Sequence, residues 1–197
     1  MTRFLDRGAL VAAGVGAGVA LVIGVSFLLI IPVEPVVVLL ALPAGALIGW
    51  YANVRAQRSA GPTGRVILNG LAAAAVTALT TIVLMVAVKA LFFAADGGYP
   101  AYNRIDRETQ QPVPPFCDPG ADCVYHRYLD AQPVDLERAG VTDAASFTRY
   151  YWDQQLRTIQ LIAGLTLAGG LFGAVVYDVR RRRRPFEPRT AVSTEPG

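Results

Sequence analysis

The sequence is poor in charge and contains few of the residues that carry acid–base or metal chemistry. Charged residues make up 17% of its 197 positions, and it holds a single histidine and two cysteines. Soluble domains contain about 25% charged residues. One histidine leaves little capacity for proton transfer near neutral pH, and no phosphate-binding loop, zinc motif or Ser/His/Asp set is recognisable. We therefore expect no enzyme activity and no cofactor or metal.

Apolar residues, by contrast, make up 53% of the chain and gather in four long runs. A bilayer core about 30 Å thick is crossed by roughly 20 helical residues. Four segments meet this length: residues 8–31, 35–52, 66–88 and 158–179, the last apolar up to position 177. The sequence therefore predicts an all-α integral membrane protein, a bundle of four transmembrane helices. The first run is longer than the apolar core of a secretion signal, so we expect it to be retained.

This pattern divides the chain into four regions. Residues 1–93 contain the first three helices with an outer extension of the third, 94–157 form a polar extracytoplasmic segment, 158–179 form the fourth helix, and 180–197 form a basic anchor and a disordered cytoplasmic tail. Loop and turn residues fill the polar segment up to Asp122, and helix signals begin at Val134. We expect little regular structure between Asp96 and Asp122.

Basic residues mark one side of the predicted bundle. They lie before the first run, in the loop 53–65, and after the fourth run as Arg180, Arg181, Arg182, Arg183 and Arg184. Such a run beside an apolar segment indicates a membrane-surface anchor, so the net charge of +3 does not indicate a nucleic-acid partner. The positive-inside rule places both termini in the cytoplasm and residues 94–157 outside. The single lysine among 18 basic residues indicates a GC-rich gene, and we expect the plasma (inner) membrane of a bacterium.

Small residues recur at every fourth position on the predicted helices. The rows are Gly16, Ala20 and Gly24 in the first helix, Ala41, Gly45 and Gly49 in the second, Gly70, Ala74 and Ala78 in the third, and Gly169 and Gly173 in the fourth. Small residues let helix backbones approach closely in lipid, where the hydrophobic effect does not drive helices together. We interpret the rows as helix-packing surfaces. The sequence leaves open whether they pack within one chain or dock another one.

The two cysteines, Cys117 and Cys123, lie in the segment predicted to be outside, where disulfides form. Between them stand Pro119 and Gly120, which favour a turn. The sequence therefore predicts a disulfide loop. A metal site that adds His126 is the alternative, although this spacing is not a standard zinc pattern.

A further helix is predicted to begin at Asp143, with Thr142 as its cap, and to continue into the fourth span. Its first turns hold four aromatic residues: Phe147, Tyr150, Tyr151 and Trp152. Aromatic side chains are enriched where a helix meets the membrane surface. We interpret them as an interfacial anchor, with a partner-binding aromatic patch as the alternative.

These features favour a small multi-pass membrane protein that acts through protein–protein contacts. We expect an accessory or assembly subunit, or a scaffold, of a membrane complex, with membrane lipids and other membrane protein chains as its partners. The alternative is a small channel or transporter for an uncharged or lipidic solute. In that case the path would be lined by Pro43, Thr77, Thr80 and Thr81.

Overall fold

The computed structural model describes residues 6–26, 34–56, 62–95, 108–110 and 117–183. This part of the chain is helical and contains no strand. Its helices are α1 (Arg7–Ser26), α2 (Glu34–Arg55), α3 (Thr63–Ala95), α4 (Ala121–Ala131), α5 (Pro133–Arg138) and α6 (Ala144–Arg183). The end of the first predicted span and residues 184–197 of the predicted tail lie outside the described residues.

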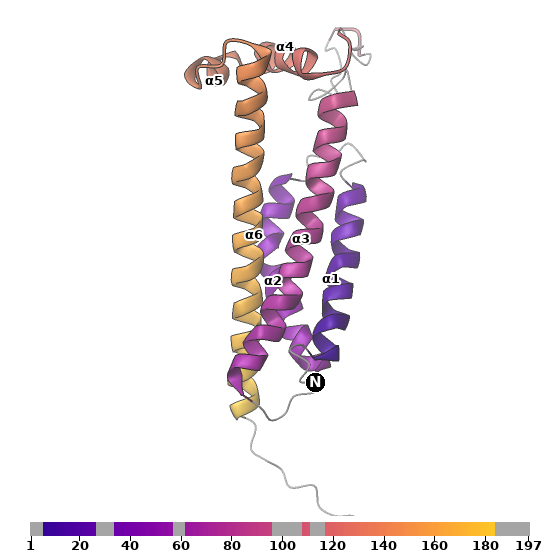
Figure 1. The fold of residues 1–197 in the computed structure, drawn as a ribbon, viewed down its shortest axis with the longest axis vertical. Coiled ribbons are helices and arrows are strands. Elements are labelled where there is room, and N and C mark those ends of the chain that lie inside the picture. The colour runs from indigo at the N-terminus through magenta and orange to yellow at the C-terminus, as the bar shows by residue number, and fades with distance from the viewer. Residues whose placement is uncertain (1–5, 27–33, 57–61, 96–107, 111–116, 184–197) are drawn as a thin grey trace, which may run out of the picture.

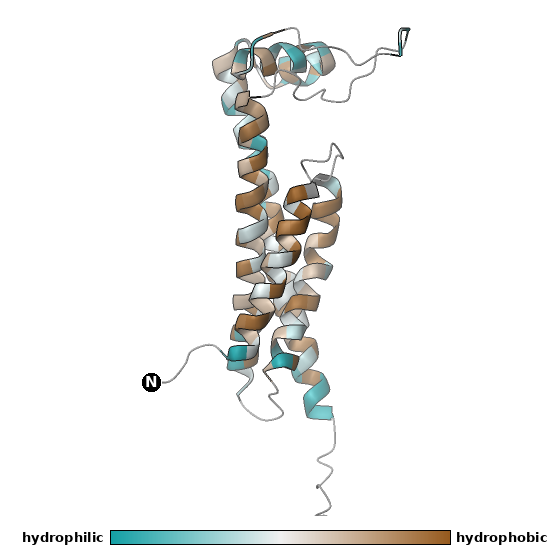
Figure 2. Ribbon diagram, turned by 90° about the vertical axis from the view of Figure 1, so that its right-hand side faces the viewer, coloured by the Kyte–Doolittle hydropathy of each residue, from teal (hydrophilic) through white to brown (hydrophobic). Residues whose placement is uncertain are grey.

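Four of these helices, α1, α2, α3 and α6, are long and apolar enough to cross a membrane, as the sequence predicts. They lie side by side (Figure 1), with α2 packed along α6 and α3 packed against both α1 and α6. Apolar residues predominate along all four helices (Figure 2), and large apolar side chains such as Leu39, Leu79 and Phe172 are exposed. This surface is suited to lipid, because each exposed apolar side chain would be unfavourable in water.

Two of the helices are much longer than a bilayer requires. α3 has 33 residues and α6 has 40, which correspond to about 50 Å and about 60 Å at 1.5 Å per residue. Both extend beyond α1 and α2 at the same end, and α4 and α5 lie across that end (Figure 1). We call the projecting ends of α3 and α6, together with α4 and α5, the cap.

The buried side chains form separate cores in the cap and in the bundle. The cap core is aromatic and aliphatic, and includes Phe93, Leu136, Phe147 and Tyr151. The bundle core between α1, α2 and α3 consists of alanines, among them Ala12, Ala52 and Ala73. Alanine cores allow close contact between helices, whereas the large side chains of the cap fill the wider space between α4, α5 and α6.

Candidate functional site

The small residues predicted on the second and fourth spans lie where α2 meets α6. A Cβ atom built at any of four glycines would lie 2.0 to 2.3 Å from a carbonyl oxygen of the facing helix: Gly45, Gly49, Gly169 and Gly173. Real Cβ atoms essentially never show such distances. The two backbones are therefore in direct contact, and we call this line of contact the α2–α6 seam.

The predicted row on the first span faces α3. A Cβ atom at Gly16 would lie 1.9 Å from Oγ1 of Thr77, and one at Gly24 would lie 2.9 Å from Cβ of Leu84. Ala20 is buried, as is Ala41 on α2. In the structure, therefore, these rows contact helices of the same chain. Gly14 and Gly18 point the other way, with nothing within 4 Å of a Cβ built on either of them.

The row predicted on the third span lies at a junction where three helices meet, to which Gly170 of α6, absent from the predicted rows, also contributes. A Cβ at Gly49 would lie 2.3 Å from the carbonyl oxygen of Gly170, and one at Gly70 would lie 3.0 Å from the same oxygen. Gly170 also faces Ala74, whose Cβ would be 2.4 Å away. The four-residue spacing from Gly70 to Ala74, which is part of the predicted packing row, marks this contact on α3. At this level α2, α3 and α6 leave no space between them for a side chain.

Several polar side chains within the spans form hydrogen bonds within the bundle. The hydroxyls of Thr77, Thr80 and Thr81 each donate to a carbonyl oxygen four residues earlier on α3, at 2.9 to 3.0 Å. Near the cap, Nζ of Lys89 donates to Oε1 of Gln155 on α6. The threonine hydroxyls thus satisfy backbone groups of their own helix.

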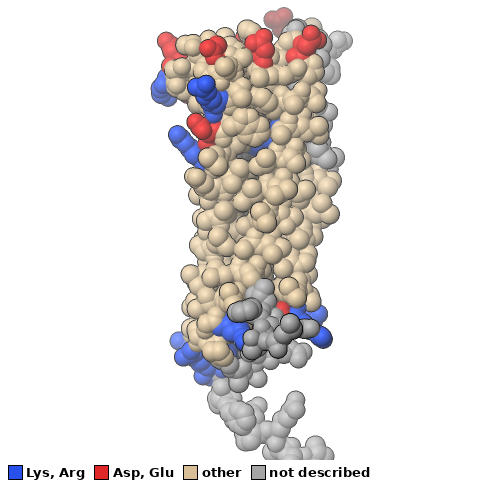
Figure 3. Space-filling view, viewed as in Figure 1, with Lys and Arg blue, Asp and Glu red and all other residues tan. Residues whose placement is uncertain are grey.

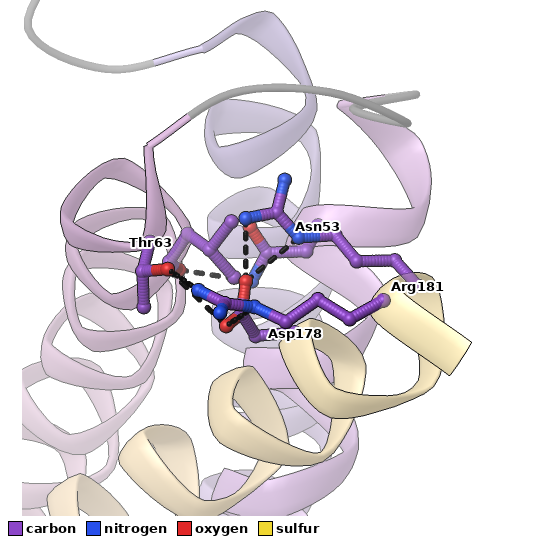
Figure 4. A network of polar contacts seen from close by, with 6 residues as sticks. Asn53, Thr63, Asp178 and Arg181 are labelled. Carbon is purple, nitrogen blue, oxygen red and sulfur yellow. Dashed lines mark hydrogen bonds and ion pairs between the residues drawn. The ribbon is translucent and has the colours of Figure 1, made fainter. Parts of the chain in front are cut away.

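The end of the bundle opposite the cap holds a charged network (Figure 4). Asp178 is buried on α6, and its carboxylate accepts hydrogen bonds from Nε of Arg181 at 2.7 Å and from Nε of Arg182 at 2.9 Å. The hydroxyl of Thr63, at the start of α3, donates to the same carboxylate at 3.2 Å. The network therefore connects the last turns of α6 to the first turn of α3.

Buried asparagines lie close to the same end. Nδ2 of Asn53 donates to the carbonyl oxygens of Gly49 and Val66, both at 3.0 Å, and so links α2 to α3. Asn69 donates to the carboxylate of Asp6 at 2.8 Å and links α3 to the segment before α1. Sequence reasoning assigned no such role to Asn53 or Asp178. Their only signal is a polar residue near the end of an apolar run.

The predicted arginine anchor is divided between different partners. Arg181 and Arg182 bind Asp178, whereas Cζ of Arg180 lies over the ring of Trp50 on α2, 4.7 Å from its centroid. Arg183 is exposed, and Arg184 lies outside the described residues. Within the part of the chain that the structure describes, Arg180 and Arg183 make no ion pair, so they are the members of the run whose charges are not compensated by a carboxylate.

At the other end, aromatic residues of the cap pack on one another. The ring of Phe93 on α3 lies 4.9 Å from that of Tyr151 and 6.5 Å from that of Phe147, both on α6. Phe147 and Tyr151 are fully buried, and Trp152 is partly buried against them. These side chains were predicted as an interfacial anchor, but Phe147 and Tyr151 instead form the centre of the cap core.

Helix α4 and the disulfide cover this core. The sulfur atoms of Cys117 and Cys123 are 1.96 Å apart, at disulfide bonding distance, so neither thiolate is available for the alternative metal site. Gly120 has φ of +142°, a conformation that favours glycine, and α4 begins at the next residue. The sequence prediction missed α4. Its signal is a stretch free of proline and glycine in which Cys123, Val124 and Arg127 share one face and are buried.

The start of α6 is fixed by reciprocal hydrogen bonds. The backbone N–H of Ser146 donates to Oδ1 of Asp143 at 2.7 Å, and Oγ of Ser146 accepts from the N–H of Asp143 at 3.1 Å. The backbone bond from Ser146, followed by the bond from its hydroxyl, lowers the pKa of Asp143 below its usual 3.8. The helix begins at Ala144. Asp143 is therefore the N-cap, one residue later than the predicted Thr142.

Charges of opposite sign gather at the two ends of the molecule (Figure 3). Acidic side chains lie along the edge of the cap that points away from the bundle, and basic side chains lie at the end of the bundle opposite the cap. The exposed acids of the cap are Asp118, Asp122, Asp130, Asp135, Glu137, Asp143 and Asp153. Exposed arginines of the cap and its base are Arg138, Arg149 and Arg157. The exposed surface of the cap is therefore acidic.

Comparison with known protein families, curated proteins and solved structures gives no match to this chain.

The structure provides two candidate sites of different chemistry. One is the acidic cap with its aromatic core, and the other is the arginine-rich end, where Arg180 and Arg183 form no ion pair with any described residue.

Proposed function

We propose that this protein acts through protein–protein contacts, as an accessory or assembly subunit or a scaffold of a membrane complex, and that the cap is the part that binds its partners. The proposal assigns it no catalytic role. The basic end would face the cytoplasm and the cap the outside of a plasma (inner) membrane, in accordance with the positive-inside rule.

The observation that carries this proposal is that the cap has its own core and stands clear of the apolar bundle. Phe93, Phe147 and Tyr151 hold the ends of α3 and α6 together, and α4 is attached over them. A rigid element of this kind presents fixed side chains to a partner at a low cost in conformational entropy. Leu129 on α4 and Val134 on α5 are exposed apolar residues beside the acidic positions Asp130 and Asp135.

The bundle gives less support to the alternative of a channel or transporter. The threonines proposed to line a path donate their hydroxyls to their own helix. Where Gly49, Gly70 and Gly170 meet, the backbones of α2, α3 and α6 leave no room even for a methyl group. A solute path between these three helices would require them to separate.

Site-specific photo-cross-linking in cells tests the proposal. A benzophenone amino acid would replace Leu129 or Val134 in the cap, and Leu39, which is 76% exposed on the apolar surface of α2, would be the matched control. We expect a discrete protein adduct from the cap positions that is absent or weaker from position 39. Adducts of equal yield at all three positions, or no adduct from the cap, would refute the proposal. Solute flux in proteoliposomes together with absent cap adducts would favour the channel or transporter.

A further inference from the structure

At the end opposite the cap, the arginines of α6 have different partners: Arg181 and Arg182 bind Asp178, whereas Arg180 lies over Trp50. We propose that Arg180 and Arg183 on α6, together with Trp50 on α2, bind the headgroup of an anionic phospholipid. This inference requires only that the four long helices span a bilayer, and it does not depend on the proposed function of the cap.

The α2–α6 seam brings the parts of this site together. A Cβ at Gly173 would lie 2.0 Å from the carbonyl oxygen of Ala46 and 2.9 Å from the backbone nitrogen of Trp50. Two turns further along α6, this close approach puts Cζ of Arg180 over the Trp50 ring. When a planar guanidinium stacks on an aromatic ring, the face of the guanidinium contacts the ring. The N–H donors lie at the edge of the guanidinium, where they can form two parallel hydrogen bonds with a phosphate.

The charges around the site favour an anion. Arg183 lies one turn after Arg180, on the same side of α6, and both side chains are exposed. The only carboxylate of α6 near them, that of Asp178, accepts hydrogen bonds from Arg181 and Arg182. It also accepts one from Thr63 at the start of α3, so it faces α3. Among the described residues, therefore, no carboxylate compensates the positive charge of Arg180 and Arg183 on the α2 side.

The surroundings favour a lipid as the source of that anion. Leu42 lies two turns before Trp50 on α2, with its carbonyl oxygen against Gly169 in the seam, and Phe172 lies two turns before Arg180 on α6; their exposures are 44% and 61%. Both lie nearer the middle of the spans than the arginines do. A phospholipid with its phosphate at Arg180 and Arg183 can thus place its acyl chains along exposed apolar side chains of both helices.

Native mass spectrometry of the full-length protein in a mild detergent tests this site. Phosphatidylglycerol and phosphatidylcholine are added in equal amounts, and the ratio of the two singly bound species is measured. We expect the wild-type protein to prefer phosphatidylglycerol. Arg180→Gln should lower the ratio about five-fold, which is the effect expected for one arginine at an anionic surface. Trp50→Leu should also lower it, although it changes no charge.

Arg182→Gln is the matched control, because it removes one charge from the same run but on the α3 side. Its ratio should stay within two-fold of the wild-type value. Equal decreases in Arg180→Gln and Arg182→Gln would overturn the proposal, since charge alone would then explain binding, and an unchanged ratio in Arg180→Gln would also overturn it. Each variant must elute as a single species on size exclusion; should Arg180→Gln fail this criterion, Arg183→Gln takes its place with the same expected decrease.

Discussion

The contact between α2 and α6 makes a quantitative prediction for Gly173→Ala. A Cβ atom there would lie 2.0 Å from a backbone carbonyl oxygen, whereas ordinary van der Waals contact begins at 3.4 Å. Because the obstacle is backbone, the helices must separate or bend, and overpacking of this kind costs about 3 kcal/mol at the upper end of its range. The higher helix propensity of alanine returns about 1 kcal/mol. We therefore expect a net loss of about 2 kcal/mol.

Gly164→Ala is the control on the same helix, because nothing lies within 4 Å of its Cβ position. This variant should keep the propensity gain and be as stable as the wild type or slightly more stable. Thermal unfolding in a mild detergent, followed by tryptophan fluorescence, should show a Tm about 4–8 °C lower for Gly173→Ala. A Gly173→Ala protein as stable as Gly164→Ala would refute the close approach of the two backbones.

Three further predictions concern the two ends. Cys117 and Cys123 should react with a membrane-impermeant maleimide in intact cells only after reduction. Replacing both by serine should lower the free energy of unfolding by about 2 kcal/mol. Labelling without reductant would contradict the disulfide, and labelling only after lysis would contradict the proposed orientation. The amide chemical shift of Ser146 should titrate with a pKa below 3.8, because its N–H donates to the carboxylate of Asp143, whose pKa is lowered. Ionised Asp143 stabilises the start of α6, and this stabilisation persists above pH 3.8 and is lost as the pH falls through the lowered pKa. A titration midpoint at or above 3.8 would contradict this prediction. Asp178→Asn should lower Tm, because it leaves Arg181 without its carboxylate partner, and the free energy of unfolding should fall by about 2 kcal/mol. Adding Arg181→Gln to the same chain should recover part of this loss. No recovery would show that the loss of the Asp178–Arg181 pair is not the cause.

Local patterns in the sequence are enough to predict the spans and the disulfide. A transmembrane helix requires only a long apolar run, and Cys117 and Cys123 need only the short turn that contains Gly120. Both features depend on neighbours along the chain. The positions of glycines at intervals of four likewise identify the faces of α2 and α6 that carry small residues.

The features that were missed depend on contacts between distant segments. Helix α4 is short, and its buried face becomes a core only where Phe93 of α3 meets Phe147 of α6. The arginine run is uniform in sequence, yet Arg180 and Arg181 have different partners, because successive residues of a helix point about 100° apart. Hydropathy and charge counts cannot distinguish these environments.

The same geometry connects the two ends of α6. Glycines at positions 169 and 173 fix how α6 is rotated and translated against α2, because only they allow the backbone contact at those two turns. A shift of α6 by one residue would rotate its faces by about 100°. It would carry Arg180 away from Trp50 at one end and turn Phe147 and Tyr151 away from Phe93 at the other. The α2–α6 seam therefore determines both the arginine site and the cap core, although no residue of the seam belongs to the cap.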